Sequence, residues 1–172
     1  ANPEMHFVHT PGLKVVCPAT AADAKGLLKS AIRDNNPVLF FEHKFLYRRI
    51  KEEVSQGVDD TIPLGKAIIR RPGRDLTIVT YAAMVHASLQ AADTLAQEGI
   101  EVEVVDLRTL APLDCDTIFE SLHRTSKLLV VHEDVRTGGI AGEIAALVTE
   151  KLFGELDGPI RRVTGLDTPV PF

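Results

Sequence analysis

The sequence predicts an α/β fold in which a mainly parallel β-sheet has helices on both faces and is preceded by a partial β-α-β unit. Short apolar runs that are typical of buried strands alternate with amphipathic stretches of about 10–15 residues that are typical of helices. The composition, 45% hydrophobic and 25% charged, is that of a globular protein and argues against disordered, collagenous and low-complexity classes.

The first segment has the pattern β-α-β. Residues 14–17 form a short strand, and a helix follows from Thr20, which caps it together with Asp23 three positions later. The helix ends at residues 34–37, because a residue that precedes proline disfavours helical geometry. Residues 38–41 are apolar without interruption, which predicts a strand buried on both faces.

The second segment repeats the alternation more fully. Residues 67–69 and 76–80 have the pattern of strands joined by a hairpin turn at 71–74. Further strands are predicted at 102–105, 128–131 and 160–163, and helices at 83–98, 115–124 and 139–153. Gly99 ends the first of these helices and Asp114 caps the second.

Charge divides the chain unevenly. Residues 1–66 carry nine Lys and Arg against eight Asp and Glu, whereas residues 67–172 carry ten against sixteen. The division lies near a long connection, and loops of that length are uncommon inside a compact unit. We therefore predict a first domain at residues 1–50, a linker at 51–66 and a second domain at 67–172. A surface loop within one domain is the alternative.

Composition and charge exclude several classes. No apolar run approaches the roughly 18 residues that span a bilayer, and the first residues lack the basic and apolar regions of a secretory signal. A net charge of −5 without a basic stripe argues against nucleic-acid binding. Cys17 and Cys115 lie far apart, which predicts small core residues in a reducing compartment rather than a disulfide, a zinc site or nucleophiles.

Residues 131–139 carry the first candidate site. A strand ends there in polar residues, and Gly138 and Gly139 begin a helix. Free N–H groups at a helix N-terminus favour a phosphate or carboxylate. Tight packing is the more frequent role of such a double glycine, because the pattern is neither GxGxxG nor a P-loop.

The second candidate lies at the end of the first helix. The carbonyl of Ala31, the carboxylate of Asp34 and the amide oxygen of Asn36 are hard oxygen donors beside the negative end of a helix dipole. Such donors suit a hard cation. A plain helix C-cap followed by an asparagine turn is the alternative.

The six histidines form the third candidate group. None has the spacing of a zinc protease. His86 and His123 are expected on helix surfaces, whereas His43 follows a buried strand and is expected at the edge of an active site.

A series of motifs is more specific than these features. They occur in order at residues 9–16 (HTPGLKVV), 23–28 (DAKGLL), 32–37 (IRDNNP), 41–44 (FEHK), 46–48 (LYR), 105–110 (VDLRTL), 132–133 (HE), 137–139 (TGG) and 165–169 (GLDTP). This order resembles the β subunit of the thiamine-diphosphate-dependent E1 component of 2-oxo acid dehydrogenase complexes, in the transketolase-like family. The resemblance covers essentially the whole chain. The FEHK and LYR motifs are closer to branched-chain and related bacterial enzymes than to the mitochondrial pyruvate enzyme.

The resemblance also implies that this chain is a fragment cut at both ends. It would hold the last β-α-β of the pyrimidine-binding domain and most of the transketolase C-terminal domain. The glutamate that contacts the aminopyrimidine, and a His-Ser-Gln stretch with an active-site histidine, belong to the missing part. We therefore assign no catalytic or cofactor-binding residue to this chain and expect the isolated fragment to be inactive.

The same resemblance implies metal ions and partners. By motif alignment, Ala31, Asp34 and Asn36 match ligands of a structural K⁺ in the intact protein, and the other ligands lie in the missing segment. Thiamine diphosphate and Mg²⁺ belong to the intact α–β assembly. The partners would be an E1 α subunit, a second β subunit and the peripheral-subunit-binding domain of the E2 acyltransferase, in a heterotetramer within a multienzyme complex.

The implied function is oxidative decarboxylation of a 2-oxo acid, branched-chain in preference to pyruvate, with acyl transfer to lipoyl-E2. This chain would supply scaffold, β–β and E2 interfaces, in a bacterial cytoplasm rather than a mitochondrial matrix. Another transketolase-like enzyme, or a stand-alone docking or dimerisation module, are the alternatives. An isolated β-α-β exposes sheet edges, so residues 1–66 are expected to self-associate or to be mobile.

Overall fold

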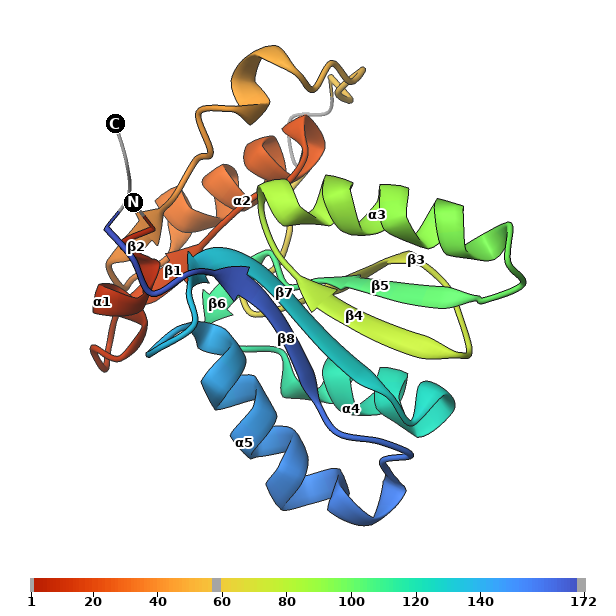
Figure 1. Cartoon of the computed structure of the whole chain (residues 1–172). Coiled ribbons are helices and arrows are strands. Elements are labelled where there is room, and N and C mark those ends of the chain that lie inside the picture. Colours follow the sequence, from red (N-terminus) through yellow and green to blue (C-terminus); the bar gives the residue numbers. More distant parts are fainter. Residues whose placement is uncertain (1, 57–59, 170–172) are drawn as a thin grey trace.

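The computed structural model describes residues 2–56 and 60–169 as two β-sheets surrounded by helices (Figure 1). The first segment contains α1 (Glu4–Val8), β1 (Lys14–Val16), α2 (Ala21–Arg33), β2 (Val38–Phe40) and the 3₁₀ helix η1 (Leu46–Arg48). The predicted cap of α2 is present, since the Asp23 N–H donates to the Thr20 hydroxyl oxygen at 3.1 Å. Helix α1 was not predicted.

The second segment builds a five-stranded sheet in the order β3-β5-β4-β7-β8. Its strands are β3 (Ile68–Arg71), β4 (Leu76–Thr80), β5 (Val102–Asp106), β7 (Leu128–Val135) and β8 (Arg161–Gly165). Its helices are α3 (Ala83–Ala96), α4 (Cys115–Thr125), α5 (Ile140–Leu152) and the 3₁₀ helix η2 (Phe153–Glu155). All neighbouring strands are parallel except β3, which is antiparallel to β5. The predicted α/β fold class is confirmed.

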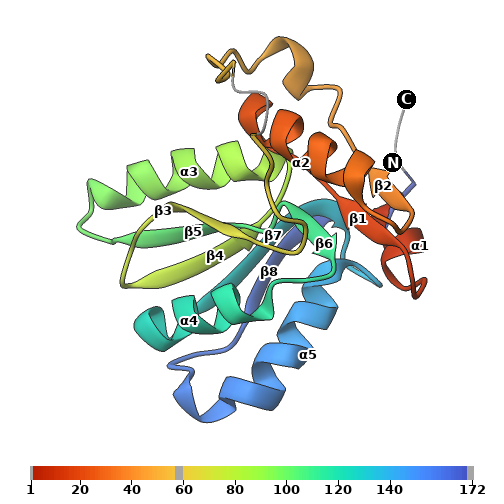
Figure 2. The same cartoon turned by 180° about the vertical axis from the view of Figure 1, so that it is seen from behind.

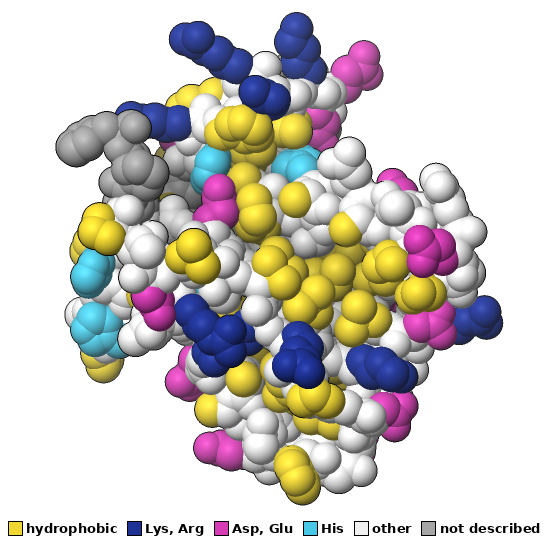
Figure 3. All heavy atoms as spheres, in the orientation of Figure 1, with side chains coloured by type: hydrophobic (Ala, Val, Ile, Leu, Met, Phe, Trp, Pro, Cys, Tyr) yellow, Lys and Arg dark blue, Asp and Glu magenta, His cyan; other side chains and the backbone are white. Residues whose placement is uncertain are grey.

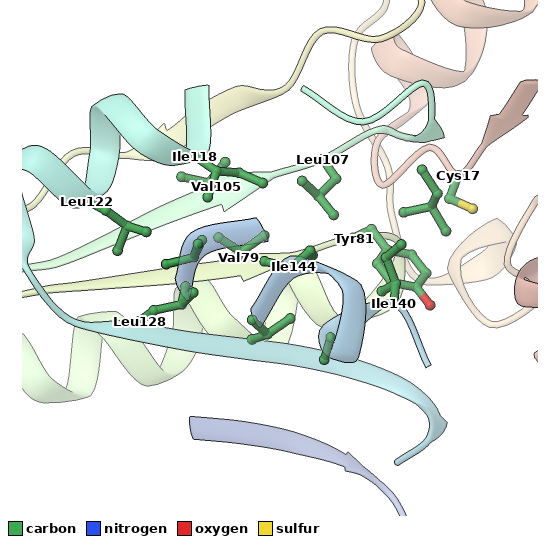
Figure 4. Close-up of a cluster of buried hydrophobic side chains, with 14 of the residues drawn as sticks. Cys17, Val79, Tyr81, Val105, Leu107, Ile118, Leu122, Leu128, Ile140 and Ile144 are labelled. Atoms are coloured by element: carbon green, nitrogen blue, oxygen red, sulfur yellow. The ribbon is translucent and has the colours of Figure 1, made fainter. Parts of the chain in front are cut away.

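Helices cover both faces of this sheet, with α3 on one side and α4 and α5 on the other (Figures 1 and 2). Val79 and Val105 pack with apolar residues of α4 and α5, a cluster shown in Figure 4. Ile78 and Val104 pack on the other face with apolar residues of α3. This division follows from the strand period, because successive side chains point to opposite faces.

The smaller sheet, in the order β2-β1-β6, joins the two segments. Strand β6 (Thr109–Ala111) follows β5 in the chain and pairs antiparallel with β1, while β2 pairs parallel with the other edge of β1. Val15 and Cys17 belong to the same apolar cluster as Val79 and Val105. The first segment is therefore anchored by the second through both backbone pairing and a shared core.

A buried ion network reinforces this junction. Arg70 of β3 donates to Asp106 Oδ2 from Nε at 3.1 Å and from Nη2 at 2.9 Å, and it also pairs with Asp23 of α2. Arg108 Nη1 lies 3.5 Å from the second oxygen of Asp23. The side chains of Asp23 and Asp106 are only 3% and 0% exposed, so the arginines supply the positive charge that burial of the two carboxylates requires.

Residues 51–66 contain neither helix nor strand in their described part, and they lie along α2. The Ile62 N–H donates to the Gly26 carbonyl at 3.2 Å, and the Ser30 hydroxyl donates to the Ile62 carbonyl at 2.6 Å. A Cβ at Gly26 would lie 2.6 Å from Ile62 Cγ1. Glycine at this position lets the connection pack closely against the helix.

Two predicted features are wrong. Strands β3 and β4 do not form a hairpin, because each pairs with β5, on opposite sides. The turn between them crosses the start of β5, where a Cβ on Gly73 would lie 2.2 Å from the Glu103 nitrogen. Strand β2 is only half-buried, because it is the edge of the small sheet in the described part of the chain. Among the residues that the structure describes, no helix is long and apolar enough to cross a bilayer.

Candidate functional sites

The structure adds a candidate site, a cavity of about 490 Å³ between the two segments. It is lined by residues of α1, by residues that follow β1, β2 and β4, and by one residue of β7; among them are Glu4, Cys17, His43, Ala82 and Glu133. Three of these strands end here at their carboxyl ends, where open α/β sheets place their ligands. His43 Nε2 lies 2.8 Å from Glu133 Oε2 and links the two segments across the cavity.

Several buried polar atoms around this cavity have no hydrogen-bond partner among the described residues: Glu4 Oε2, His43 Nδ1, Tyr81 Oη and His132 Nε2. Burial raises the pKa of Glu4, and the nearby carboxylates of Asp134 and Glu133 raise it further. Burial also raises the pKa of Tyr81. The region therefore favours neutral acids, which hold their protons and are able to donate them in hydrogen bonds.

His132 is a neutral member of the same region. Its Nδ1 lies 3.1 Å from the Asp134 carbonyl oxygen, which only accepts, so Nδ1 carries the proton and Nε2 is left as an acceptor. Burial lowers the pKa of His132, and its ring stacks on Tyr81 with centroids 6.4 Å apart. Burial raises the pKa of Cys17 well above its usual range, which agrees with a core thiol rather than a nucleophile.

A second cavity, of about 260 Å³, lies at the carboxyl ends of β1 and β2. Pro18, Ala19 and Thr20 line one side, and His43, Leu46, Tyr47 and Ile50 line the other. The Tyr47 hydroxyl donates to Glu42 Oε2 at 2.6 Å. The cavity is mainly apolar and open on one side.

The predicted cation ligands do lie together at the end of α2. The Asp34 N–H donates to the Ala31 carbonyl at 3.3 Å, and Asp34 Oδ1 accepts from the Asn36 backbone and side-chain nitrogens at 2.9 and 3.0 Å. The other carboxylate oxygen pairs with Lys14, which with these bonds lowers the pKa of Asp34 to about 2. The lysine ammonium thus neutralises the Asp34 carboxylate, which is the strongest of the three predicted cation ligands. The described residues supply a partial ligand set that fits a cation only when further oxygens join it.

The two glycines at residues 138–139 have different roles: Gly138 adopts a left-handed φ of 73° with open space around it, and Gly139 serves close packing. A Cβ on Gly139 would lie 2.6 Å from the Val135 carbonyl oxygen and 2.7 Å from His132 Cε1. The neighbouring Thr137 donates from its N–H and hydroxyl to Asp167 at 3.0 and 2.9 Å, so an acidic side chain is held in the loop just before this helix. This arrangement argues against an anion site.

The remaining histidines differ in role. His123 is half-exposed and pairs with Glu155 at 2.6 Å, as expected for a surface residue. His86 is half-buried rather than exposed: its Nε2 lies 2.8 Å from the Ala19 carbonyl, so it donates from α3 to the turn after β1. The prediction failed there because helical periodicity does not reveal the second segment that covers this face. Cys17 is buried and Cys115 is half-buried, and both are free thiols.

Sequence reasoning missed Glu4 and Tyr81. Tyr81 directly follows the buried strand β4, so the carboxyl-end rule applied to that strand indicates it. Glu4 carries no such signal, because its burial depends on contacts between segments far apart in the chain.

Comparison with known proteins identifies the family. Residues 65–172 match the transketolase C-terminal domain, and residues 1–49 match the transketolase pyrimidine-binding domain. The chain belongs to the transketolase family. Within it, the resemblance to E1 β subunits is confirmed. This transketolase-family chain is 51% identical over 96% of its length to the 2-oxoisovalerate dehydrogenase subunit beta of Bacillus subtilis.

Two further relatives are named for other enzymes. The chain is 55% identical over 96% of its length to the acetoin:2,6-dichlorophenolindophenol oxidoreductase subunit beta of Cupriavidus necator. It is 49% identical over 99% of its length to the pyruvate dehydrogenase E1 component subunit beta of Bacillus subtilis. It spans about half the length of these relatives, covering 50%, 48% and 54% of them.

Solved structures agree with the fold. A split-gene transketolase described as an inactive beta4 tetramer superposes with a TM-score of 0.76 at 28% identity, covering 94% of this chain and 50% of that one. Transketolase from Pichia stipitis superposes over 95% of this chain and 22% of its own with a TM-score of 0.61 at 19% identity, which supports the fold alone.

Proposed function

We propose that this chain is part of the β subunit of a 2-oxo acid dehydrogenase E1 component, an enzyme that decarboxylates a 2-oxo acid oxidatively and passes the acyl group to lipoyl-E2. The proposal rests on a sequence identity of about 50% to E1 β subunits over nearly the whole chain. Thiamine diphosphate, when bound in the α–β assembly, supplies the electron sink for decarboxylation. We expect the assembly in a bacterial cytoplasm, and Mg²⁺ with the cofactor.

The substrate we favour is a branched-chain 2-oxo acid. Support comes from the FEHK and LYR motifs and from the 51% identity to a 2-oxoisovalerate dehydrogenase subunit. Acetoin is a second candidate substrate, because the relative named for it is 55% identical. Pyruvate is the third, at 49%.

The test is a dye-reduction assay on the intact enzyme. The full-length β gene is co-expressed with its α gene, and reduction of 2,6-dichlorophenolindophenol is followed with 3-methyl-2-oxobutanoate, pyruvate or acetoin. The highest kcat/KM with 3-methyl-2-oxobutanoate supports the branched-chain assignment. A preference for acetoin or pyruvate overturns that assignment but keeps the family. Turnover of sugar phosphates alone contradicts the E1 proposal.

Within this subunit, the described residues act as scaffold rather than as catalysts. The network around Arg70 and the pairing of β6 with β1 bind the two segments into one unit. We propose that a structural K⁺ is held at Ala31, Asp34 and Asn36 when further oxygen ligands are supplied in the intact protein. The carbonyl groups at the C-terminal end of α2 support this, because they concentrate partial negative charge there.

The sheet face beside α3 is the surface we propose for contact with a second β subunit. Figure 3 shows hydrophobic side chains gathered there, over β4, β7 and β8. Leu129 and Val131 are only partly buried by α3, and Val163 is 55% exposed. Helix α3 covers this face whereas α4 and α5 cover the other, and apolar strand residues remain open beside α3 (Figures 1 and 2). An apolar face of this kind is typical of an obligate interface.

The stand-alone docking module is separated from this proposal by a pull-down. The 172-residue chain is immobilised and offered the peripheral-subunit-binding domain of E2, with and without the α subunit. Capture by the chain alone supports a role in E2 binding. Its net acidic second segment supports attraction to a basic partner. Capture only by the full heterotetramer assigns E2 binding to surfaces outside this chain.

A further inference from the structure

The segment after β2 forms a basic and aromatic surface. Residues 44–51 contain four basic side chains and no acidic one, although the whole chain has a net charge of −5. We use the name basic-aromatic surface for the exposed residues Lys44, Phe45, Tyr47, Arg48, Arg49 and Lys51. Figure 3 shows dark-blue side chains gathered at this end of the molecule, with hydrophobic side chains beside them.

The aromatic residues of this surface are held in place while exposed. Phe45 and Tyr47 are 54% and 62% exposed. The Arg49 guanidinium lies 4.2 Å from the Phe45 ring centroid, and the His43 ring contacts Phe45 edge-on. The bond from Tyr47 to Glu42 fixes the tyrosine. Preordered aromatic and arginine side chains are enriched at the centres of protein interfaces, because little conformational entropy is lost when they bind.

The cationic groups are available to a partner. Within the described part of the chain, Lys44, Arg48 and Lys51 make no ion pair or hydrogen bond through their side chains. Three exposed carboxylates flank the surface: Glu42 accepts from Tyr47, Glu52 accepts from the Ala22 N–H at 3.0 Å, and Glu53 follows Glu52 in the sequence. Residues 42–53 together carry four Lys and Arg against three Glu, so the segment keeps a net positive charge that is concentrated at residues 44–51.

A cavity lies beside this charge. The 260 Å³ cavity at the ends of β1 and β2 has Leu46, Tyr47 and Ile50 as one wall and Ala21 and Ala24 of α2 as another. Its size and mainly apolar lining suit one large apolar side chain. A pocket flanked by cations is the arrangement that anchors a peptide by one buried side chain and steers it by charge.

We propose that the basic-aromatic surface docks an acidic polypeptide segment that inserts one apolar side chain into the cavity at the ends of β1 and β2. An acidic partner is favoured over a second copy of this chain, because the chain is itself acidic and two copies repel at long range. This docking does not depend on the decarboxylation proposed above.

The test uses the 172-residue chain and fluorescein-labelled peptides. One peptide contains Glu and Asp with a single phenylalanine, a second has alanine in place of the phenylalanine, and a third replaces the acids by lysines. Fluorescence anisotropy at low and at physiological salt gives each Kd. We expect the acidic phenylalanine peptide to bind most tightly, with an affinity that falls as salt rises.

Two variants locate the binding. Lys44→Glu combined with Arg48→Glu is expected to weaken binding about tenfold or more, because two attractions become repulsions. The matched control, Arg74→Glu with Lys151→Glu, makes the same charge change at two other exposed positions and is expected to leave Kd nearly unchanged. Ala24→Leu fills the cavity and is expected to remove the advantage of the phenylalanine peptide over the alanine peptide.

Three results overturn the proposal. Equal weakening by the control pair assigns the binding to net charge alone. An unchanged preference for phenylalanine in the Ala24→Leu variant excludes the cavity. Tighter binding of a single-stranded RNA oligonucleotide than of the acidic peptide reassigns the surface to nucleic acid. Circular dichroism of each variant confirms that the chain is folded, so that lost binding is attributed to the surface.

Discussion

The Arg70→Met substitution tests the idea that the two segments are held together by a buried ion network. Arg70 makes two hydrogen bonds to Asp106 and an ion pair to Asp23, whose side chains are 0% and 3% exposed. Methionine fills similar volume without charge, so both carboxylates lose their main partner while they stay buried. Among the described residues, Arg108 at 3.5 Å from Asp23 is the cation that remains close.

The expected loss is large. Removing one partner of a buried ion pair costs about 3–5 kcal/mol, because an uncompensated charge is left in a medium of low dielectric. For a chain of this size, each kcal/mol shifts Tm by about 2–4 °C, so a drop of roughly 6–20 °C is expected. The control Lys127→Met breaks an exposed pair with Asp157, at 51% and 64% exposure, and is expected to cost less than about 1 kcal/mol.

The pH dependence provides an independent check. Burial raises the pKa of Asp106 even with the arginines present, so removing Arg70 raises it further. A raised folded pKa means that stability is present at low pH and is lost as pH rises through that pKa. The loss caused by Arg70→Met is therefore smaller at about pH 4.5 than at about pH 7.5. Urea unfolding at both pH values measures it.

A loss below about 1 kcal/mol at neutral pH would refute the reasoning, since it would mean that water or another cation compensates the carboxylates. A loss that is large but independent of pH would show that packing of the arginine stem, not its charge, matters. The double variant Arg70→Met with Asp106→Asn separates these cases. It restores stability relative to Arg70→Met only if the unpaired charge is the cause.

Three further predictions follow from single sites. Val163→Glu places a charge on the apolar face beside α3 and is expected to shift sedimentation of the assembled enzyme toward smaller species. The control Phe153→Glu changes a residue that is 75% exposed on the other side and is expected to leave sedimentation unchanged. Equal sedimentation of the two variants contradicts the proposed β–β surface. Glu4→Gln removes a carboxyl whose pKa is raised by burial, so it is expected to stabilise the chain relative to wild type as pH rises above the folded pKa, and a urea midpoint that is unchanged at neutral pH argues against burial of that charge. Asp34→Asn in the intact subunit is expected to abolish stabilisation by KCl over NaCl, and Lys14→Met to keep or increase it; K⁺-dependent Tm in the Asp34→Asn variant excludes this cation site.

The elements were predictable because their signals are local. The Thr20 cap, the Asp114 cap and the Gly139 start of α5 each depend on residues within one helical turn, and the structure shows all three where the sequence indicates. The helix-end group of Ala31, Asp34 and Asn36 is local for the same reason. Whether it binds a cation depends on oxygens elsewhere, and this part stays a prediction.

The pairing of strands was less predictable, because it depends on contacts between distant segments. The turn at residues 71–74 has hairpin composition, yet β4 is a central strand, buried from Thr77 onward, that takes β5 and β7 as parallel neighbours and leaves β3 to the outer edge of β5. His86 was predicted at the surface for the same reason: its partner, the Ala19 carbonyl, is 67 residues away. Glu4 and Tyr81 meet only after both segments are folded.

The same long-range contacts decide how the first segment folds. Strand β1 has three residues, and its neighbours β2 and β6 also have three each, so the small sheet supplies few backbone hydrogen bonds of its own. Its buried residues Val15 and Cys17 contact the core of the second segment, and the carboxylate of Asp23 is neutralised by arginines from that segment. The stability of α2 and β1 therefore depends on their contacts with the second segment and its five-stranded sheet. We therefore predict that the two segments unfold together in one cooperative transition, which urea unfolding monitored by circular dichroism would show as a single step, although the outer edge of β2 and the exposed Ile32 on α2 remain open to further strands or chains.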